Sequence, residues 1–146
     1  MKMKRFATIL LLFIVVLLTA CKSASTPQPA AGGIGKKVAV DGGYYIDISV
    51  AELQTMLANK DFVFVNVHIP FEGNIAQTDL SLPYDQIEQN VAKLPTDMNT
   101  KIVLYCRSGR MSAIAAETLV RLRFSNVWNL SGGMAAWEQV GLPIER

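Results

Sequence analysis

Two short, near-continuous apolar runs constrain the fold of this 146-residue chain more than any other feature. They read FVFVNV at residues 62–67 and KIVLY at residues 101–105. A strand covered on both faces has this pattern, whereas a half-exposed strand alternates apolar and polar residues. Segments with apolar residues at helical spacing stand before and after these runs. Strands that alternate with helices predict a single α/β domain with a mainly parallel sheet, flanked by helices on both faces.

The remaining elements are expected from capping and turn signals. Ser49, followed three residues later by Glu52, has the pattern of a capping box and predicts a helix that ends near residue 59. We expect further strands at residues 44–48 and 126–129, a long loop at 68–83, and further helices at 84–91, from 111–112 onward and from 134 to the glycine at 141. The chain's two cysteines are too few for a disulfide scaffold.

The first 20 residues have the composition of a secretory signal peptide. Three basic residues stand within residues 1–5, and the stretch FATILLLFIVVLLTA follows at residues 6–20. This stretch is shorter than the roughly 20 apolar residues that a membrane-spanning helix needs. It leads into Leu18-Thr19-Ala20-Cys21, which resembles the lipobox of bacterial lipoproteins. The resemblance implies cleavage before Cys21, a lipid on its sulfur, and a protein anchored in the bacterial cell envelope that faces the periplasm or another extracytoplasmic space. Ordinary cleavage and an uncleaved anchor are the alternatives.

Residues 21–43 separate this signal from a domain predicted at residues 44–146. The segment is rich in Ser, Pro, Ala and Gly, a composition that buries little apolar surface, so we predict a flexible linker. Removal of the signal takes away three basic side chains and leaves 11 basic and 12 acidic ones, so the net charge changes from +2 to about −1 and the apparent basicity belongs to the signal. This charge balance is too mild for a protein that binds nucleic acid through a basic face, and the chain has no long run of charge, so nucleic acid is not an expected partner.

Cys106 stands directly after the second apolar run, at the predicted carboxyl end of a parallel strand. Ligands of parallel α/β folds bind at such strand ends. Arg107-Ser108-Gly109-Arg110 forms the turn that follows, and a helix is expected to begin after it. Backbone N–H groups and the dipole at a helix start attract an anion, and the two arginines add positive charge, so we expect the thiolate form to be favoured. The alternative is an inert cysteine buried in the core.

The residues around Cys106 resemble the active-site loop of rhodanese-like sulfurtransferases. The loop reads YCRSGRMS at residues 105–112, and the sequences LSGGMAAW at 130–137 and GLP at 141–143 resemble the C-terminal signature of that family. With the order of strands and helices, the resemblance extends over residues 44–146. It implies a rhodanese-like fold and a two-step transfer of sulfane sulfur. Cys106 would attack the outer sulfur of a donor such as thiosulfate, and a thiol or cyanide would then take that sulfur from the resulting persulfide.

The resemblance also assigns roles within this loop. The backbone amides from Arg107 to Met111 would cradle the anionic persulfide. Arg107 and Arg110 would either attract the donor or remain solvated charges. The hydroxyls of Ser108 and Ser112 would hydrogen-bond to the sulfur or cap the helix, and for Ser112 a cap is the favoured interpretation. The substrate-binding set is therefore Arg107, Ser108, Gly109, Arg110, Met111 and Ser112.

Two departures from related sequences bear on the site. Cysteine phosphatases have a similar loop, but six residues after the nucleophile they need an arginine that binds phosphate, and this chain has Ser112 there. A phosphatase is therefore not expected. Many rhodanese-like domains end the preceding strand in Asp-x-Arg, whereas this chain has Asn66-Val67-His68. His68 is either a pH-sensitive contact near the site or a structural residue.

Three functions are consistent with these patterns. The first is an envelope-tethered sulfurtransferase that uses Cys106; the second is a non-catalytic module that binds a protein partner; the third is a thiol redox or persulfide-carrier role. The intact loop favours the first. The expected partners are a small sulfur donor, a thiol acceptor and a membrane reached through the lipid. We expect no metal and no cofactor, since the chain has one histidine and no C-x-x-C pair.

Overall fold

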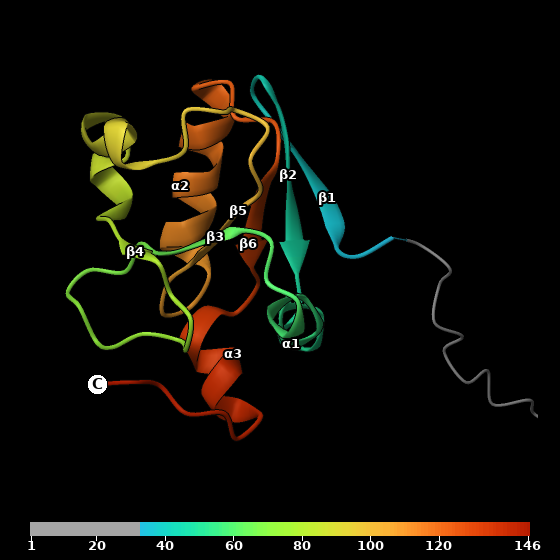
Figure 1. The fold of residues 1–146 in the computed structure, drawn as a ribbon, viewed down its shortest axis with the longest axis vertical. Helices are drawn as coiled ribbons and strands as arrows, with labels where there is room; N and C mark the ends of the chain where they lie inside the picture. Colours follow the sequence, from blue (N-terminus) through green and yellow to red (C-terminus); the bar gives the residue numbers. More distant parts are fainter. Residues whose placement is uncertain (1–32) are drawn as a thin grey trace, which may run out of the picture. The chain divides into compact units, whose positions relative to one another are not determined.

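The computed structural model describes residues 33–146, so the predicted signal peptide and the predicted lipid site at Cys21 lie outside the described residues. The described strands form one sheet in the order β1-β2-β6-β5-β3-β4 (Figure 1). β1 and β2 are antiparallel, and the other neighbouring pairs are parallel. The strands are Lys36–Val40 (β1), Gly43–Ile48 (β2), Val63–Asn66 (β3), Leu80–Ser81 (β4), Ile102–Tyr105 (β5) and Val127–Leu130 (β6).

Helices cover both faces of this sheet, with α2 on one face and α1 and α3 on the other (Figure 1). The α-helices are Val50–Ala58 (α1), Arg110–Arg121 (α2) and Gly133–Gln139 (α3), and the 3-10 helices are Tyr84–Gln86 (η1) and Glu88–Lys93 (η2). The predicted fold class, an α/β domain with a mainly parallel sheet between two helical layers, is confirmed. In the described part of the chain, no helix has the length and apolar character needed to cross a membrane.

The two apolar runs are buried because β3 and β5 lie between both helical layers. Val65 and Leu104 belong to the core cluster that packs against α2, whereas Phe64 and Tyr105 belong to the cluster under α1 and α3. All four side chains are completely buried. Successive residues of a strand point to opposite faces, so a strand with a core on each side needs an apolar residue at nearly every position.

The linker prediction was wrong for residues 36–43, and the folded domain begins before residue 44. Lys36–Val40 forms strand β1, which pairs antiparallel with β2, and the register places Val40 opposite Gly43. Asp41-Gly42 makes the turn between the two strands, which is a common hairpin sequence. Val38 and Val40 pack against the core beside α2. The apolar residues at alternate positions in this segment therefore outweigh the Ser, Pro, Ala and Gly composition that surrounds it.

Residues 80–93 also differ from expectation in detail. The predicted helix at residues 84–91 is instead the pair η1 and η2, in which an amide donates to the carbonyl three residues earlier, as from Asn90 to Ile87 at 3.1 Å. The predicted loop at residues 68–83 contains the two-residue strand β4, paired with β3. A strand this short depends on its neighbour and has no periodic pattern of its own.

The predicted capping box of α1 is present and also anchors the first strand. Ser49 Oγ accepts a hydrogen bond from the Glu52 amide at 3.3 Å, and Glu52 Oε2 accepts one from the Ser49 amide at 2.7 Å. Glu52 Oε1 accepts a third hydrogen bond from the Gly35 amide at 2.8 Å. These amides, that of Ser49 most of all, hold the pKa of the Glu52 carboxyl below its usual value.

Replacing Glu52 with glutamine should lower the free energy of unfolding by about 1 kcal/mol near neutral pH, because a neutral amide accepts these hydrogen bonds less strongly. A carboxyl whose folded pKa is lowered stabilises the fold above its unfolded pKa, and this contribution is lost as the pH falls through the folded value. Urea unfolding of both proteins at neutral and at acidic pH checks this. If the two proteins differed equally in free energy of unfolding at both pH values, the prediction would be contradicted.

Candidate active site

Cys106 follows β5 directly, at the carboxyl end of the strand, and leads into the loop that opens α2. The residue is buried, with 1% of its surface exposed. The Gly109 amide donates a hydrogen bond to Cys106 Sγ at 3.1 Å, which is the kind of contact that stabilises negative charge on sulfur. The structure thus places Cys106 where the sequence predicted it, with one of the expected loop amides directed at its sulfur.

Ser112 contacts the cysteine and does not cap α2. Its Oγ lies 3.4 Å from Cys106 Sγ and 3.2 Å from the Gly109 carbonyl oxygen, so its single proton serves one of these acceptors at a time. The helix begins at Arg110, and its N-cap is Gly109, with no side-chain cap. The favoured interpretation of Ser112 as a cap is therefore wrong. Ser112 is the third residue of α2, and a side chain in this first turn faces back toward the preceding loop.

The two sequence signatures form one structural unit around the cysteine. The amides of Met134 and Ala135, at the start of α3, donate to the carbonyls of Cys106 and Arg107, each at 2.9 Å. The close approach leaves no room for a Cβ at Gly133 and little room for one at Gly109. A Cβ at Gly133 would lie 2.1 Å from the Cys106 carbonyl oxygen, and one at Gly109 would lie 3.0 Å from the Gly132 amide nitrogen. The C-terminal signature therefore holds the backbone of the active-site loop.

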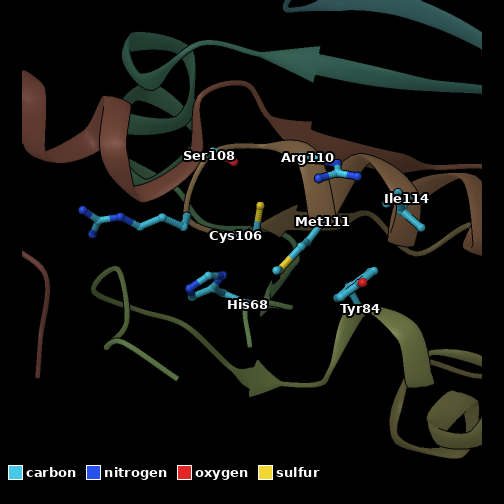
Figure 2. Close-up of a pocket in the computed structure, with 8 residues that line it drawn as sticks. His68, Tyr84, Cys106, Ser108, Arg110, Met111 and Ile114 are labelled. Atoms are coloured by element: carbon cyan, nitrogen blue, oxygen red, sulfur yellow. The ribbon is translucent and has the colours of Figure 1, made fainter. Parts of the chain in front are cut away.

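A cavity of about 200 Å³ opens beside Cys106 (Figure 2). It is lined by His68, Tyr84, Cys106, Arg107, Ser108, Arg110, Met111 and Ile114. The volume is about that of seven water molecules, at roughly 30 Å³ each, and suits a small anion or a short thiol. The sequence did not single out Tyr84 or Ile114. The only available signal for Ile114 was its position three residues after Met111, on the same face of the helix.

The two arginines of the loop have different surroundings. Arg107 Nη1 lies 3.0 Å from a carboxylate oxygen of Glu138 and 3.5 Å from one of Glu72, so its charge is partly balanced. Arg110 lines the cavity and is exposed, and it makes no ion pair with the residues that the structure describes. Of the two predicted roles, attraction of an anionic donor fits Arg110, whereas Arg107 also joins the loop to α3.

Asn66, the last residue of β3, organises the loop that follows this strand. The side chain is buried, with 1% of the residue exposed. Its Nδ2 donates to the Gly73 carbonyl at 2.9 Å and to Asn74 Oδ1 at 3.0 Å, while its Oδ1 accepts from the His68 amide at 2.9 Å. A carboxylate at this position would have no proton to donate to two of these partners. The asparagine side chain thus satisfies these three partners without placing a charge in the core.

The match to a known family extends over most of the folded region. The family model described as the rhodanese-like domain matches residues 49–140. The chain belongs to the rhodanese-like domain family. Cys106, its loop and the signature at the start of α3 all lie inside the matched range.

A named relative supports sulfur transfer as an activity within this family. A sulfurtransferase of Allochromatium vinosum is 36% identical over an alignment of 94 residues, and the match covers 62% of this chain and 85% of that protein. A tRNA uridine(34) hydroxylase of an Enterobacter species is 28% identical over an alignment of 116 residues, and the match covers 73% of this chain but only 33% of that protein. The rhodanese-related protein of Thermoplasma volcanium has a similar solved structure, with a TM-score of 0.59 at 29% identity over 68% of this chain and 97% of that one.

Proposed function

We propose that this protein is a sulfurtransferase in which Cys106 carries sulfane sulfur from a small anionic donor such as thiosulfate to a thiol or cyanide. The observation that carries the proposal is the position of Cys106 Sγ, which accepts a hydrogen bond from the Gly109 amide and borders a cavity of about 200 Å³ beside Arg110. An inert core cysteine needs neither the hydrogen bond nor the cavity. The named sulfurtransferase among the relatives supports the same reaction class.

The chemistry of the first step follows from these contacts. The Cys106 thiolate attacks the outer sulfur of thiosulfate and forms a new S–S bond. The S–S bond within thiosulfate breaks, its electron pair leaves with sulfite, and Cys106 becomes an anionic persulfide. The Gly109 amide and the Ser112 hydroxyl lie on the side of Sγ where they stabilise this negative charge. Arg110 attracts the donor and the leaving anion.

A tether to the cell envelope is the second part of the proposal, and it rests on the lipobox-like sequence that ends in Cys21. Replacing Cys21 with alanine should move the protein from the membrane fraction to the soluble fraction when the natural host is lysed and centrifuged. Full retention of the variant in the membrane fraction would contradict lipidation at this residue.

Incubation of the full chain with thiosulfate should yield one extra sulfur atom on the protein and one equivalent of sulfite. Intact-mass spectrometry and a colorimetric sulfite assay measure the two products, and peptide mapping places the added sulfur on Cys106 and not on Cys21. Addition of 2-mercaptoethanol or cyanide should then remove the sulfur. Absence of both products from a protein with a reduced Cys106 thiol would contradict the proposal and favour a binding module.

A further inference from the structure

His68 is a buried side chain that borders the same cavity as Cys106 and has no hydrogen-bond partner there. The side chain is 8% exposed, and neither ring nitrogen makes a hydrogen bond with a residue that the structure describes. Figure 2 shows the imidazole across the cavity from the Cys106 side chain. Buried polar groups almost always have a hydrogen-bond partner, so an imidazole that lacks one beside a nucleophile indicates a functional role.

The loop holds this imidazole in a defined orientation. The His68 amide donates to Asn66 Oδ1 at 2.9 Å, which fixes the backbone at the end of β3. His68 Nε2 lies 3.5 Å from Glu72 Oε1, four residues later in the same loop. A carboxylate beside one ring nitrogen favours the tautomer that carries its proton there. Nδ1 is then the nitrogen with a free lone pair.

The charged and titratable groups near the imidazole come from its own loop, from α2 and from η1. Glu72, on the same loop, has one carboxylate oxygen 3.5 Å from His68 Nε2 and the other 3.5 Å from Arg107 Nη1. Arg110 lines the cavity from α2, and Tyr84 lines it from η1. The positive charge of Arg110 attracts a substrate anion to the cavity, and the Glu72 carboxylate places a negative charge beside the imidazole.

We propose that His68 is the proton acceptor for a thiol co-substrate, which makes small thiols of ordinary acidity the preferred sulfur acceptors. This inference rests on the proposed function, because it concerns the second half of the same reaction. A thiol reacts as its thiolate, and a cysteine-like thiol with a pKa of about 8.5 is mostly protonated at neutral pH. A base in the cavity converts the bound thiol to its reactive thiolate, as in enzymes that pair a sulfur nucleophile with an imidazole.

The balanced step moves one proton and one sulfur atom. The S–H proton of the acceptor passes to His68 Nδ1, and the thiolate forms an S–S bond to the outer sulfur of the Cys106 persulfide. The bond between Cys106 Sγ and that sulfur breaks, and its electron pair returns to Cys106 as thiolate. The imidazolium then gives its proton to the departing persulfide of the acceptor. No oxidant or reductant is consumed.

The test compares two acceptors of similar size but different acidity, 2-mercaptoethanol and 2,2,2-trifluoroethanethiol. At a pH between the two pKa values, 2-mercaptoethanol is mostly protonated. Trifluoroethanethiol is mostly thiolate and has no S–H proton to give. The full chain and its His68→Gln variant are loaded with sulfur to completion and freed of donor. Rapid quenching and mass spectrometry then follow the loss of the extra sulfur. In the variant, the ratio of the rate with 2-mercaptoethanol to that with trifluoroethanethiol should fall about 100-fold.

An unchanged ratio in the His68→Gln variant would overturn this inference while leaving the proposed function in place. Failure of the unaltered protein to accept sulfur from thiosulfate would overturn both. If the His68→Gln variant does not fold, the Glu72→Gln variant provides the same comparison, because that side chain is 43% exposed and its replacement leaves the core untouched. In the Glu72→Gln variant, the ratio of the two rates should also fall, but by less than in His68→Gln. The imidazole remains in this variant, while the carboxylate that orients it is gone. A ratio equal to that of the unaltered protein would again count against the proposal.

Discussion

Replacing Cys106 with serine should reduce sulfur uptake from thiosulfate to background while the domain stays folded. Serine has nearly the same shape, and its Oγ can accept the hydrogen bond that the Gly109 amide gives to Sγ. A hydroxyl does not ionise at neutral pH and has no sulfur to form a persulfide, so the first step has no nucleophile. The sulfite assay and intact-mass spectrometry measure the loss, and a thermal unfolding curve measures the fold.

The chain offers a matched control in its other cysteine. The Cys21→Ser variant should retain the full rate of sulfite release, because residue 21 lies outside the matched family range of residues 49–140. Sulfur uptake by Cys106→Ser at more than a few per cent of the normal rate would mean that Cys106 is not the nucleophile. Loss of uptake in both variants would assign a part of the reaction to Cys21.

The sequence predicted the centre of the fold well because the centre depends on local pattern. The apolar runs that become β3 and β5 are buried on both faces, and this requirement is visible in the residues themselves. The elements that were missed depend on pairing. β4 has two residues and is held by β3, and the hairpin partner of β2 was hidden in a segment whose composition resembles a linker.

In the candidate site, too, the local features were predicted and the features that depend on tertiary contacts were not. Cys106 and its loop were predicted because strand, nucleophile, glycine turn and helix start are contiguous in the chain. The ion pairs of Arg107 with Glu72 and Glu138 join segments more than 30 residues apart and leave no local signal. The burial of His68 was equally invisible, because it results from a loop whose course is set by the Asn66 amide. Sequence pattern thus located the nucleophile, while tertiary contacts determine what surrounds it.

Replacing Gly133 with alanine should destabilise the domain by at least about 3 kcal/mol and remove sulfur uptake with it. The new Cβ would lie 2.1 Å from the Cys106 carbonyl oxygen and 2.9 Å from the Arg107 carbonyl carbon, and both are backbone atoms that no side-chain rotation can move aside. Relief requires a shift of α3 away from the active-site loop. That shift lengthens the hydrogen bonds from the Met134 and Ala135 amides, each 2.9 Å long, which hold the loop in place. Urea unfolding and the sulfite assay measure the two effects.

The Gly141→Ala variant separates the steric conflict from backbone strain. Gly141 also has a left-handed backbone, with φ of 83° against 55° at Gly133, but a Cβ there would meet nothing within 4 Å. Its replacement should therefore cost only the conformational strain of a non-glycine residue, about 1 kcal/mol, and leave sulfur uptake intact. If both variants lost the same stability, contact with the Cys106 carbonyl would not be the reason for glycine at position 133. A larger loss at Gly133, accompanied by loss of sulfur uptake, would show that the C-terminal signature acts by fixing the backbone that carries the nucleophile.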